Sequence, residues 1–453
     1  MPVIGILTAL GLLVCLRDWR VRMPWLLSLG LAAPVSSALP AGAPALPAIY
    51  LIAFVLVVLC AWDWVFNHPT FPTWAGSTLI VVFVGWTALI TLAGPTLFDG
   101  IGVYTAQFEA SDGRVALFPL TYTGSNAAQL IYILVAVALL FALASRLPLS
   151  RHVLLPGLFG CMALSLWRLV SEKTGILPFP VSAIDSGNLT FIDGTATGDY
   201  RLRGVFSEPS GLAHYATGAM ALGIVMLFMC RGRIRIAYAA LAGMAGINLI
   251  YAHSGTGLIG GGLVLVLAFG LVAARAIRNN RGFTELVVLA CAGLVAALFV
   301  WRPIVAYASG LINDKVGSTS YNERTGWDLY SLKLTTDTFG LGVGIGSNRP
   351  STLWPTLLSC TGIIGTALFI AFLIAVLGRA SRVPAAWPAM ALAMSVLITR
   401  SVAGGSFVAD PLLWVALGIC ANLSGLPTGE TRETMSPALS ATSRRGSLRS
   451  SAP

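Results

Sequence analysis

The chain alternates between long apolar stretches and short polar segments along almost its whole length. Thirteen apolar runs predict helices, and they cover residues 3–16, 24–41, 47–65, 75–96, 127–146, 152–171, 210–230, 235–252, 257–275, 284–303, 353–378, 385–401 and 405–423. A helix of about 20 apolar residues spans the ~30 Å hydrocarbon layer of a bilayer. The runs are continuous and lack the alternation that membrane β-strands require. The pattern therefore predicts an all-α polytopic membrane protein with about 12–14 transmembrane helices.

Composition supports a membrane-embedded chain. Hydrophobic residues make up 56% of the 453 positions and charged residues 10%, whereas soluble domains average about 25% charged residues. The first run, Val3 to Leu16, has no basic segment before it and no small-residue cleavage site after it, which favours a first helix over a signal peptide. The cysteines lie within or at the ends of apolar runs, where they imply neither a disulfide framework nor a metal site. They are Cys15, Cys60, Cys161, Cys230, Cys291, Cys360 and Cys420.

The net charge of +10 is carried largely by short loops between the apolar runs. These loops hold thirteen arginines: Arg17, Arg20, Arg22, Arg146, Arg151, Arg231, Arg233, Arg235, Arg275, Arg278, Arg281, Arg379 and Arg382. The positive-inside rule makes such loops cytoplasmic. The basic charge therefore indicates the orientation of the chain in a membrane, with a cytoplasmic C-terminus, and no nucleic-acid partner.

Three long polar segments, residues 98–126, 172–209 and 303–352, then fall on the outer side. They hold twelve of the eighteen Asp and Glu residues and all three lysines. Residues 1–426 are expected to form a transmembrane domain whose polar chemistry lies at the outer face. Residues 427–453 are rich in Ser, Thr, Arg and Pro and predict a disordered cytoplasmic tail.

The first candidate segment runs from Arg201 to Tyr215 (RLRGVFSEPSGLAHY), at the end of the second outer loop. Pro209 suits the first turn of a helix, and Ser207 is placed to cap it. Exposed amides at a helix N-terminus favour an anion. With Arg201 and Arg203 beside them, they predict a site for phosphate or diphosphate at the outer interface.

The second candidate segment is the third outer loop, where NERTGWD at residues 322–328 leads through a helical stretch to GLGVGIGSNR at residues 340–349. Four glycines at alternate positions do not form a comfortable helix. We expect a bent backbone that a ligand or another segment approaches closely, with Ser347, Asn348 and Arg349 presented at its end.

These two motifs together resemble those of the Wzy-type O-antigen and exopolysaccharide polymerases, a superfamily that includes the O-antigen ligases. The resemblance lies in Arg201 with GVFSEPS at 204–210 and an Ala at position 213, followed by GVGIGSNR at 342–349 and GIIG at 362–365. It also covers the helix layout over most of the chain.

The resemblance implies a membrane-embedded glycosyltransferase of the C type (GT-C), with large periplasmic loops, in the bacterial inner membrane. Such a polymerase moves a growing glycan from undecaprenyl diphosphate onto the non-reducing end of a lipid-linked repeat unit at the periplasmic face. It requires no metal and no other cofactor. The implied partners are the undecaprenyl-diphosphate-linked oligosaccharide, the lipid bilayer, and the chain-length regulator and flippase of the same pathway.

A departing lipid diphosphate develops negative charge, which fixed guanidinium groups stabilise. The candidates are Arg201, Arg203 and Arg324, with Arg349 contacting diphosphate or glycan from the third loop. Arg201 occupies the arginine position of the family motif, three residues before Gly204.

An acceptor hydroxyl needs a base, or a hydrogen-bond acceptor that orients it. Glu208 is the first candidate and Glu323 the second, while His214 lies about a turn and a half into the predicted helix. A different reading of the same residues is a salt bridge between Glu208 and Arg203, with Asp199 pairing the other arginine.

Two further functions fit part of the sequence. The ligases carry a histidine late in the third loop, whereas Ser347 to Trp354 contains none, which favours polymerase over ligase. A lipid-linked glycan flippase or transporter usually keeps polar residues at the midplane on broken helices. A buried acid does occur within the last apolar run, Asp410, and we expect it to pair with Arg400 in a structural role.

Overall fold

The computed structural model describes residues 3–39, 46–67, 73–109, 115–145, 147–185, 200–279, 309–310, 319–404 and 407–425. The predicted helix at 284–303 and the predicted tail at 427–453 lie outside these residues. All structural statements below refer to the described part of the chain.

Helices dominate the described residues. They are α1 (Val3–Leu16), α2 (Trp19–Gly30), α3 (Ala48–Phe66), α4 (Ser77–Leu97), α5 (Gly124–Ala144), α6 (Leu155–Thr174), α7 (Val181–Ile184), α8 (Pro209–Met229), α9 (Arg233–Ala252), α10 (Gly255–Asn279), α12 (Thr319–Asp337), α13 (Leu353–Ala380), α14 (Trp387–Val402) and α15 (Pro411–Gly425). A short 3₁₀ turn, η1 (Pro384–Ala386), precedes α14. Two strands, β1 (Gly102–Glu109) and β2 (Val115–Pro119), form an antiparallel hairpin.

Seven helical segments of the described chain are long and apolar enough to cross a membrane: α3, α4, α5, α8, α9, α13, and α14 with its preceding turn. The apolar helices α1 and α15 are shorter. The chain is therefore a multi-pass helical membrane protein. Two predicted runs are shifted. Helix α2 ends at Gly30, before Pro34, and α15 begins only at Pro411, a residue that suits the first turn of a helix.

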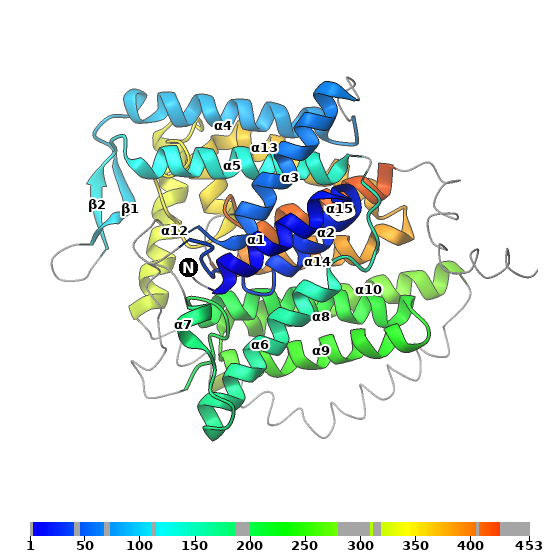
Figure 1. The fold of residues 1–453 in the computed structure, drawn as a ribbon. Helices are drawn as coiled ribbons and strands as arrows, with labels where there is room; N and C mark the ends of the chain where they lie inside the picture. Colours follow the sequence, from blue (N-terminus) through cyan, green and yellow to red (C-terminus); the bar gives the residue numbers. More distant parts are fainter. Residues whose placement is uncertain are drawn as a thin grey trace, which may run out of the picture.

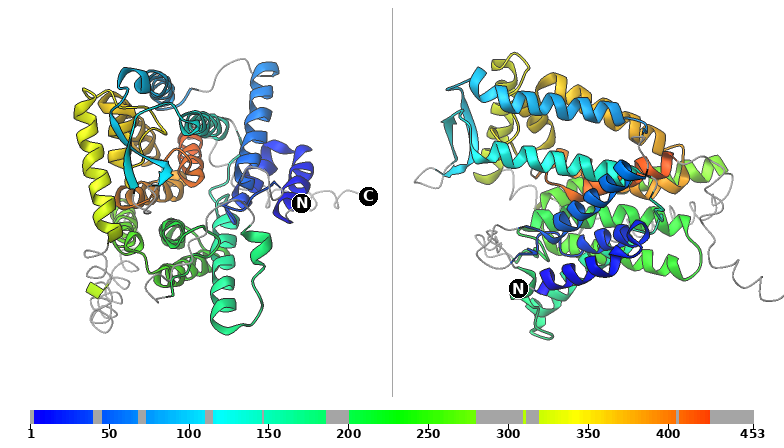
Figure 2. Two further views of the ribbon diagram at one scale, coloured as in Figure 1. Left: turned by 90° about the vertical axis from the view of Figure 1, so that its left-hand side faces the viewer. Right: turned by 45° about the horizontal axis from the view of Figure 1, so that its top comes forward.

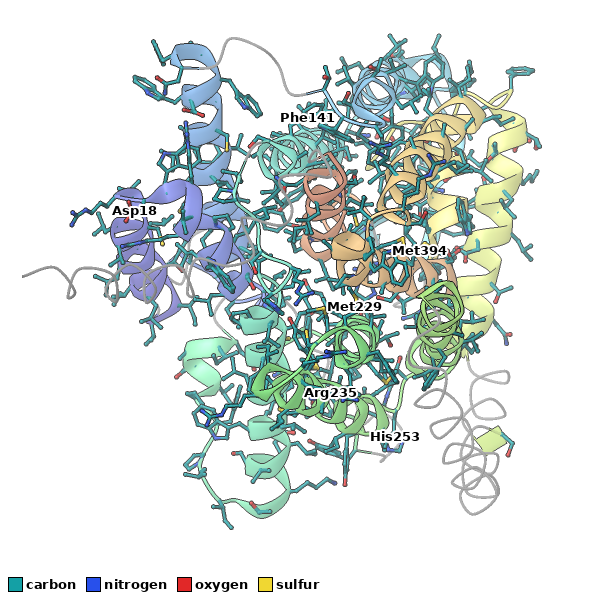
Figure 3. The ribbon with its side chains drawn as sticks, turned by 90° about the vertical axis from the view of Figure 1, so that its right-hand side faces the viewer. Asp18, Phe141, Met229, Arg235, His253 and Met394 are labelled. Atoms are coloured by element: carbon teal, nitrogen blue, oxygen red, sulfur yellow. The ribbon has the colours of Figure 1, made fainter. Side chains whose placement is uncertain are left out.

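The helices run back and forth between two unlike ends of the molecule (Figure 1). One end, here called the loop end, holds α7, α12 and the β1–β2 hairpin, together with the starts of α5, α8 and α13 (Figures 1 and 2). The opposite end, the turn end, carries tight connections such as the one from Met229 to Arg233. Figure 3 views the molecule from the turn end and labels Asp18 and Arg235 there.

Helix α8 is the centre of one half of the bundle. It packs against α6, α9, α10 and α14, and 78% of its most apolar 18-residue window is buried. Small residues allow this close packing: a Cβ added at Gly218 would lie 2.7 Å from Leu392, and one at Gly223 would lie 3.0 Å from Ala242. A helix that is apolar on all sides lies in a protein interior or in lipid, and α8 lies in the protein interior.

Residues 340–349, here called the Gly-rich segment, support a break in α13. Gly362 has φ +70° and interrupts the helix. Backbone hydrogen bonds bridge the break: the Val343 amide donates to the Ser359 carbonyl at 2.9 Å, and the Ile363 amide donates to the Gly340 carbonyl at 2.8 Å. In a membrane protein such a break is tolerated only where the freed backbone groups find partners inside the protein.

Alternate glycines make this contact possible. Gly340, Gly342, Gly344 and Gly346 have φ between +75° and +89°, a region that glycine adopts without steric cost. A Cβ at Gly342 would lie 2.9 Å from the Cys360 carbonyl oxygen, and one at Gly346 would lie 2.5 Å from that of Ser125. The predicted bent backbone and close approach are confirmed, and the approaching segments are helices α4, α5 and α13.

The hairpin joins the first long polar segment to the third. This element was not expected from the sequence. The Tyr104 carbonyl accepts a hydrogen bond from the Arg349 amide at 2.9 Å, and the Tyr330 hydroxyl of α12 donates to the Gly102 carbonyl at 2.9 Å. The rings of Tyr104 and Tyr330 meet edge to face, 5.3 Å apart. Two separate polar segments thus pack as one unit at the loop end.

We predict that Gly346→Ala destabilises the protein by about 1–3 kcal/mol, because the alanine must hold a positive φ against the Ser125 carbonyl. Thermal unfolding of the purified protein in detergent measures the effect. Gly243→Ala is the matched control, since position 243 is exposed on α9 with open space around it; there a gain of about 0.5–1 kcal/mol is expected. Equal stability of the two variants would contradict the packing described for the Gly-rich segment.

Candidate functional site

The first group of predicted site residues lies in the loop that leads into α8. Arg203 is 5% exposed, and its Nη2 forms an ion pair with Asp185 Oδ2 at 2.5 Å. Asp185 follows α7 and also pairs with Arg168 of α6 at 3.0 Å. Arg168 in turn donates to the Gly204 carbonyl at 3.1 Å. This loop, residues 201–208 (here called the motif loop), is therefore fixed to α6 by a buried set of charges.

A second set of contacts holds the residues beside Arg201. The Tyr200 hydroxyl donates to Glu172 at 2.5 Å, and the Lys173 ammonium lies 3.8 Å from the centre of the Tyr200 ring. Burial raises the pKa of Tyr200, and the neighbouring Glu172 carboxylate raises it further. On the other side, the Leu202 amide donates to the Tyr251 carbonyl at 2.9 Å. Arg201, which is partly exposed, is thus held from both sides.

The alternative reading, a salt bridge between Arg203 and Glu208, is wrong. Arg203 forms its ion pair with Asp185, and Asp199 lies outside the described residues. Asp185 is eighteen positions earlier in the chain, and only the fold of α6 and α7 brings it to the motif loop. A buried guanidinium needs a nearby carboxylate, because an unpaired buried charge is costly.

Glu208 lies at the junction of the motif loop and α8. It occupies the residue before the helix, with Pro209 in the first turn as predicted, whereas Ser207 does not cap the helix. The Ser210 hydroxyl donates to Glu208 Oε1 at 2.5 Å. Its side chain is half-buried, so that a carboxylate is presented at the loop end beside the start of α8.

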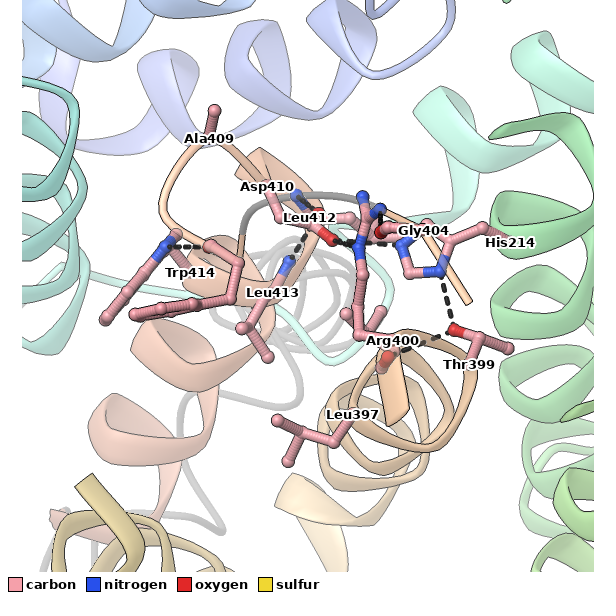
Figure 4. A network of polar contacts seen from close by, with 12 residues as sticks. His214, Leu397, Thr399, Arg400, Gly404, Ala409, Asp410, Leu412, Leu413 and Trp414 are labelled. Carbon is pink, nitrogen blue, oxygen red and sulfur yellow. Dashed lines mark hydrogen bonds and ion pairs between the residues drawn. The ribbon is translucent and has the colours of Figure 1, made fainter. Parts of the chain in front are cut away.

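His214 is buried in a polar network that joins α8 to α14 and α15 (Figure 4). Its Nδ1 lies 2.6 Å from Thr399 Oγ1, and its Nε2 lies 3.0 Å from Asp410 Oδ2. Arg400 Nε donates to the same Asp410 oxygen at 2.8 Å, which confirms the predicted pair. Because His214 is 3% exposed and both of its ring nitrogens have polar partners, we interpret its role as structural.

Asp410 also caps α15. Its Oδ1 accepts from the Leu412 amide at 3.1 Å and from the Leu413 amide at 3.3 Å. With His214 and Arg400, these two amides give the buried carboxylate four hydrogen-bonding partners.

The second group of site residues lies at the end of the Gly-rich segment. Ser347 accepts a hydrogen bond from Asn126 at 2.7 Å, and Asn348 donates to Ser331 at 2.8 Å and to Ser359 at 3.0 Å. Both side chains are buried. The expectation that the end of the segment is presented to the outside holds only for Arg349, which is exposed.

Arg324 and Glu323 lie half-buried near the start of α12. Asp328, one turn later, accepts from the Ser351 amide at 2.6 Å and from the Thr352 hydroxyl at 2.8 Å, which fixes α12 to the start of α13. Within the described residues, neither Arg324 nor Arg349 has a carboxylate partner.

Ser351 connects the two groups. Its hydroxyl lies 3.4 Å from the Arg324 carbonyl oxygen, and its own carbonyl accepts from the Gly404 amide at 2.8 Å. The Gly404 carbonyl in turn accepts from the Arg400 guanidinium, whose side chain is 19% exposed. Arg400 was expected to have a structural role alone, and the structure adds that it links the third segment to the α8 network.

The described residues contain no group of three or more His, Cys, Asp or Glu side chains arranged to hold a metal ion. No family model matches the chain, and no curated protein matches its sequence. The two motifs and the geometry of the loop end are therefore what indicates a function.

We predict that Asp185→Asn destabilises the protein by about 3–5 kcal/mol, because it leaves Arg168 and Arg203 buried without their shared carboxylate. Asp18→Asn is the control, since the Asp18–Arg22 pair is exposed and is worth about 0–1 kcal/mol. Thermal or denaturant unfolding in detergent distinguishes them. If the two substitutions had the same effect, the buried charges would not be what fixes the motif loop.

Proposed function

We propose that this chain is a polysaccharide polymerase of the bacterial inner membrane. It transfers a growing glycan from undecaprenyl diphosphate onto the non-reducing end of a lipid-linked repeat unit. In this proposal the loop end faces the periplasm and the arginine-rich turn end faces the cytoplasm, as the positive-inside rule requires.

The observation that carries the proposal is that arginines of two separate polar segments lie at the loop end, opposite the basic turns. Arg201 and Arg203 belong to the motif loop, and Arg324 and Arg349 belong to the third segment. Arg400 links the third segment, through Gly404 and Ser351, to Asp410 and the α8 network. A diphosphate carried by a lipid is an anion held at the membrane surface, and guanidinium groups bind such anions well. The motif resemblance supports the same substrate.

The proposed reaction is a single displacement at the donor sugar. The acceptor hydroxyl attacks the anomeric carbon, the bond from that carbon to the diphosphate oxygen breaks, and a glycosidic bond forms. Glu208 takes the hydroxyl proton, and the departing diphosphate keeps the bonding electrons. Arg201 stabilises the charge that develops on the leaving oxygen. Glu323 is the second candidate for the base.

The buried contacts divide these arginines by role. Arg203 is already paired with Asp185, so it holds the loop and contributes less free charge to the leaving group. Arg201 and Glu208 flank it on the partly exposed side of the same loop. Arg324 and Arg349 approach from the third segment, where they suit the diphosphate or the glycan.

We predict that Arg201→Ala lowers the rate of polymerisation by about 10²–10³-fold, the usual cost of removing one group that stabilises a developing anion. Arg324→Ala is expected to lower it as well. Purified protein in proteoliposomes with lipid-linked repeat units is assayed for a ladder of chain lengths, and the variants should leave mostly single units.

Arg235→Ala is the matched control, because Arg235 is exposed at the turn end and should leave the ladder unchanged. Wild-type chain lengths in both Arg201→Ala and Arg324→Ala would sink the proposal. Transfer of glycan to a different acceptor lipid would indicate a ligase. Movement of repeat units between leaflets without any polymer would indicate a flippase.

A further inference from the structure

Helix α12 carries exposed apolar side chains, although it lies outside the set of spanning helices. Leu329 is 62% exposed, Leu332 is 41% exposed, and Phe339, just after the helix, is 87% exposed. These three residues are here called the α12 strip. The opposite face of the helix is buried, with Ser331 and Leu334 at 0% exposure. The strip is therefore exposed apolar surface on a helix whose exposed residues also include Thr336 and Asp337.

The strip lies beside the point on α13 at which buried residues give way to exposed ones. From Pro355 to Gly362 most of α13 is buried, because α12 and the Gly-rich segment cover it. Immediately after, Ile363 is 59% exposed and Ile364 is 46% exposed. The Ile363 amide donates to the carbonyl of Gly340, the residue next to Phe339. Phe339 is thus continuous with the face of α13 that a membrane-spanning helix turns to lipid.

The length of α13 indicates the depth in the membrane at which its buried part ends and its exposed part begins. Gly362 to Ala380 is a run that rises by roughly 27 Å as a helix, close to the ~30 Å hydrocarbon thickness. Ile374, further along the same run, is 68% exposed. The part of α13 before Gly362 then stands above the hydrocarbon, and Phe339 lies at the level where the hydrocarbon begins.

The backbone holds Phe339 outward. Its φ is +53°, an uncommon conformation for a bulky residue. Hydrogen bonds fix it on both sides, from the Phe339 amide to the Thr336 carbonyl at 3.0 Å and from the Gly340 amide to the Thr335 carbonyl at 2.8 Å. Lys333, exposed on the same side of α12, has a stem long enough to place its ammonium among lipid phosphates.

The position of α12 at the edge of the molecule leaves the strip open. Viewed onto the loop end, α12 runs along one margin of the bundle (Figure 2), and from the opposite end its side chains again line the periphery (Figure 3).

We infer that α12 is an interfacial helix whose strip inserts into the loop-end leaflet of the bilayer, with phospholipid as its partner. The inference depends on the multi-pass architecture and does not depend on the proposed catalytic function. Exposed apolar side chains beside a basic residue are the chemistry of such insertion. The strip and Lys333 supply both, on a helix that also exposes Asp337. Moving an exposed aromatic ring from water into lipid is also favourable, because the transfer removes apolar surface from water.

We predict that nitroxide labels on Phe339→Cys and Leu332→Cys collide more with oxygen, which concentrates in lipid, than with a water-soluble nickel chelate. The protein is reconstituted in vesicles of phosphatidylethanolamine and phosphatidylglycerol. Val266→Cys is the lipid reference, because Val266 is 73% exposed within α10. Arg231→Cys, exposed between α8 and α9, is the water reference. The unmutated chain, in which the six described cysteines are buried, gives the background.

An oxygen-to-nickel ratio near that of the Val266 label, and several-fold above that of the Arg231 label, supports the inference. A ratio near the Arg231 label would mean that the strip faces water and would overturn it. Low collision rates with both reagents would overturn it too, since a second copy of the chain would then cover the strip.

Discussion

A backbone that enters a membrane must satisfy its polar groups within the protein, and the loop end of this molecule is arranged around one place where that requirement is hardest to meet. Gly362 breaks α13, and the Gly-rich segment supplies the missing hydrogen bonds through Val343, Gly344 and Gly340. The segment can come so close only because every second residue lacks a side chain. The position of Arg349, the hairpin and the start of α13 all follow from this contact.

Buried charges are likewise paired within the protein. Asp185 serves Arg168 and Arg203, and Asp410 serves Arg400 and His214. Each carboxylate ties together segments that are distant in sequence: the first fixes the motif loop to α6, and the second fixes α8 to α14 and α15. Removing either carboxylate would leave guanidinium groups in surroundings that solvate them poorly. The partly exposed groups, Arg201 and Glu208, are therefore carried on a rigid support.

Apolar periodicity and length were enough to predict most helices, since a run of about 20 apolar residues has few other stable forms. The close approach at the alternate glycines was also predictable, because φ and space restrict what such a pattern can do. The helical stretch before Gly340 was expected, but the start of α12 at Thr319 and its packing on α13 were not, and neither were the hairpin and the partner of Arg203. The polarity of residues 319–337 is mixed, and Asp185 is brought to Arg203 only by the tertiary arrangement of α6 and α7. Pairings set by tertiary structure leave no local pattern in the sequence.

The attachment of α12 to α13 has a consequence for the surrounding bilayer. Asp328 bonds to Ser351 and Thr352, so α12 cannot move along the membrane normal without α13. The vertical separation between the strip and the far end of α13 is consequently a fixed length of the protein. In membranes of different thickness, either the lipid stretches or thins or the bundle tilts to match this length. Each adjustment costs fractions of a kcal/mol per Å of mismatch. The stability of the protein should then depend on acyl-chain length, with an optimum set by its own geometry.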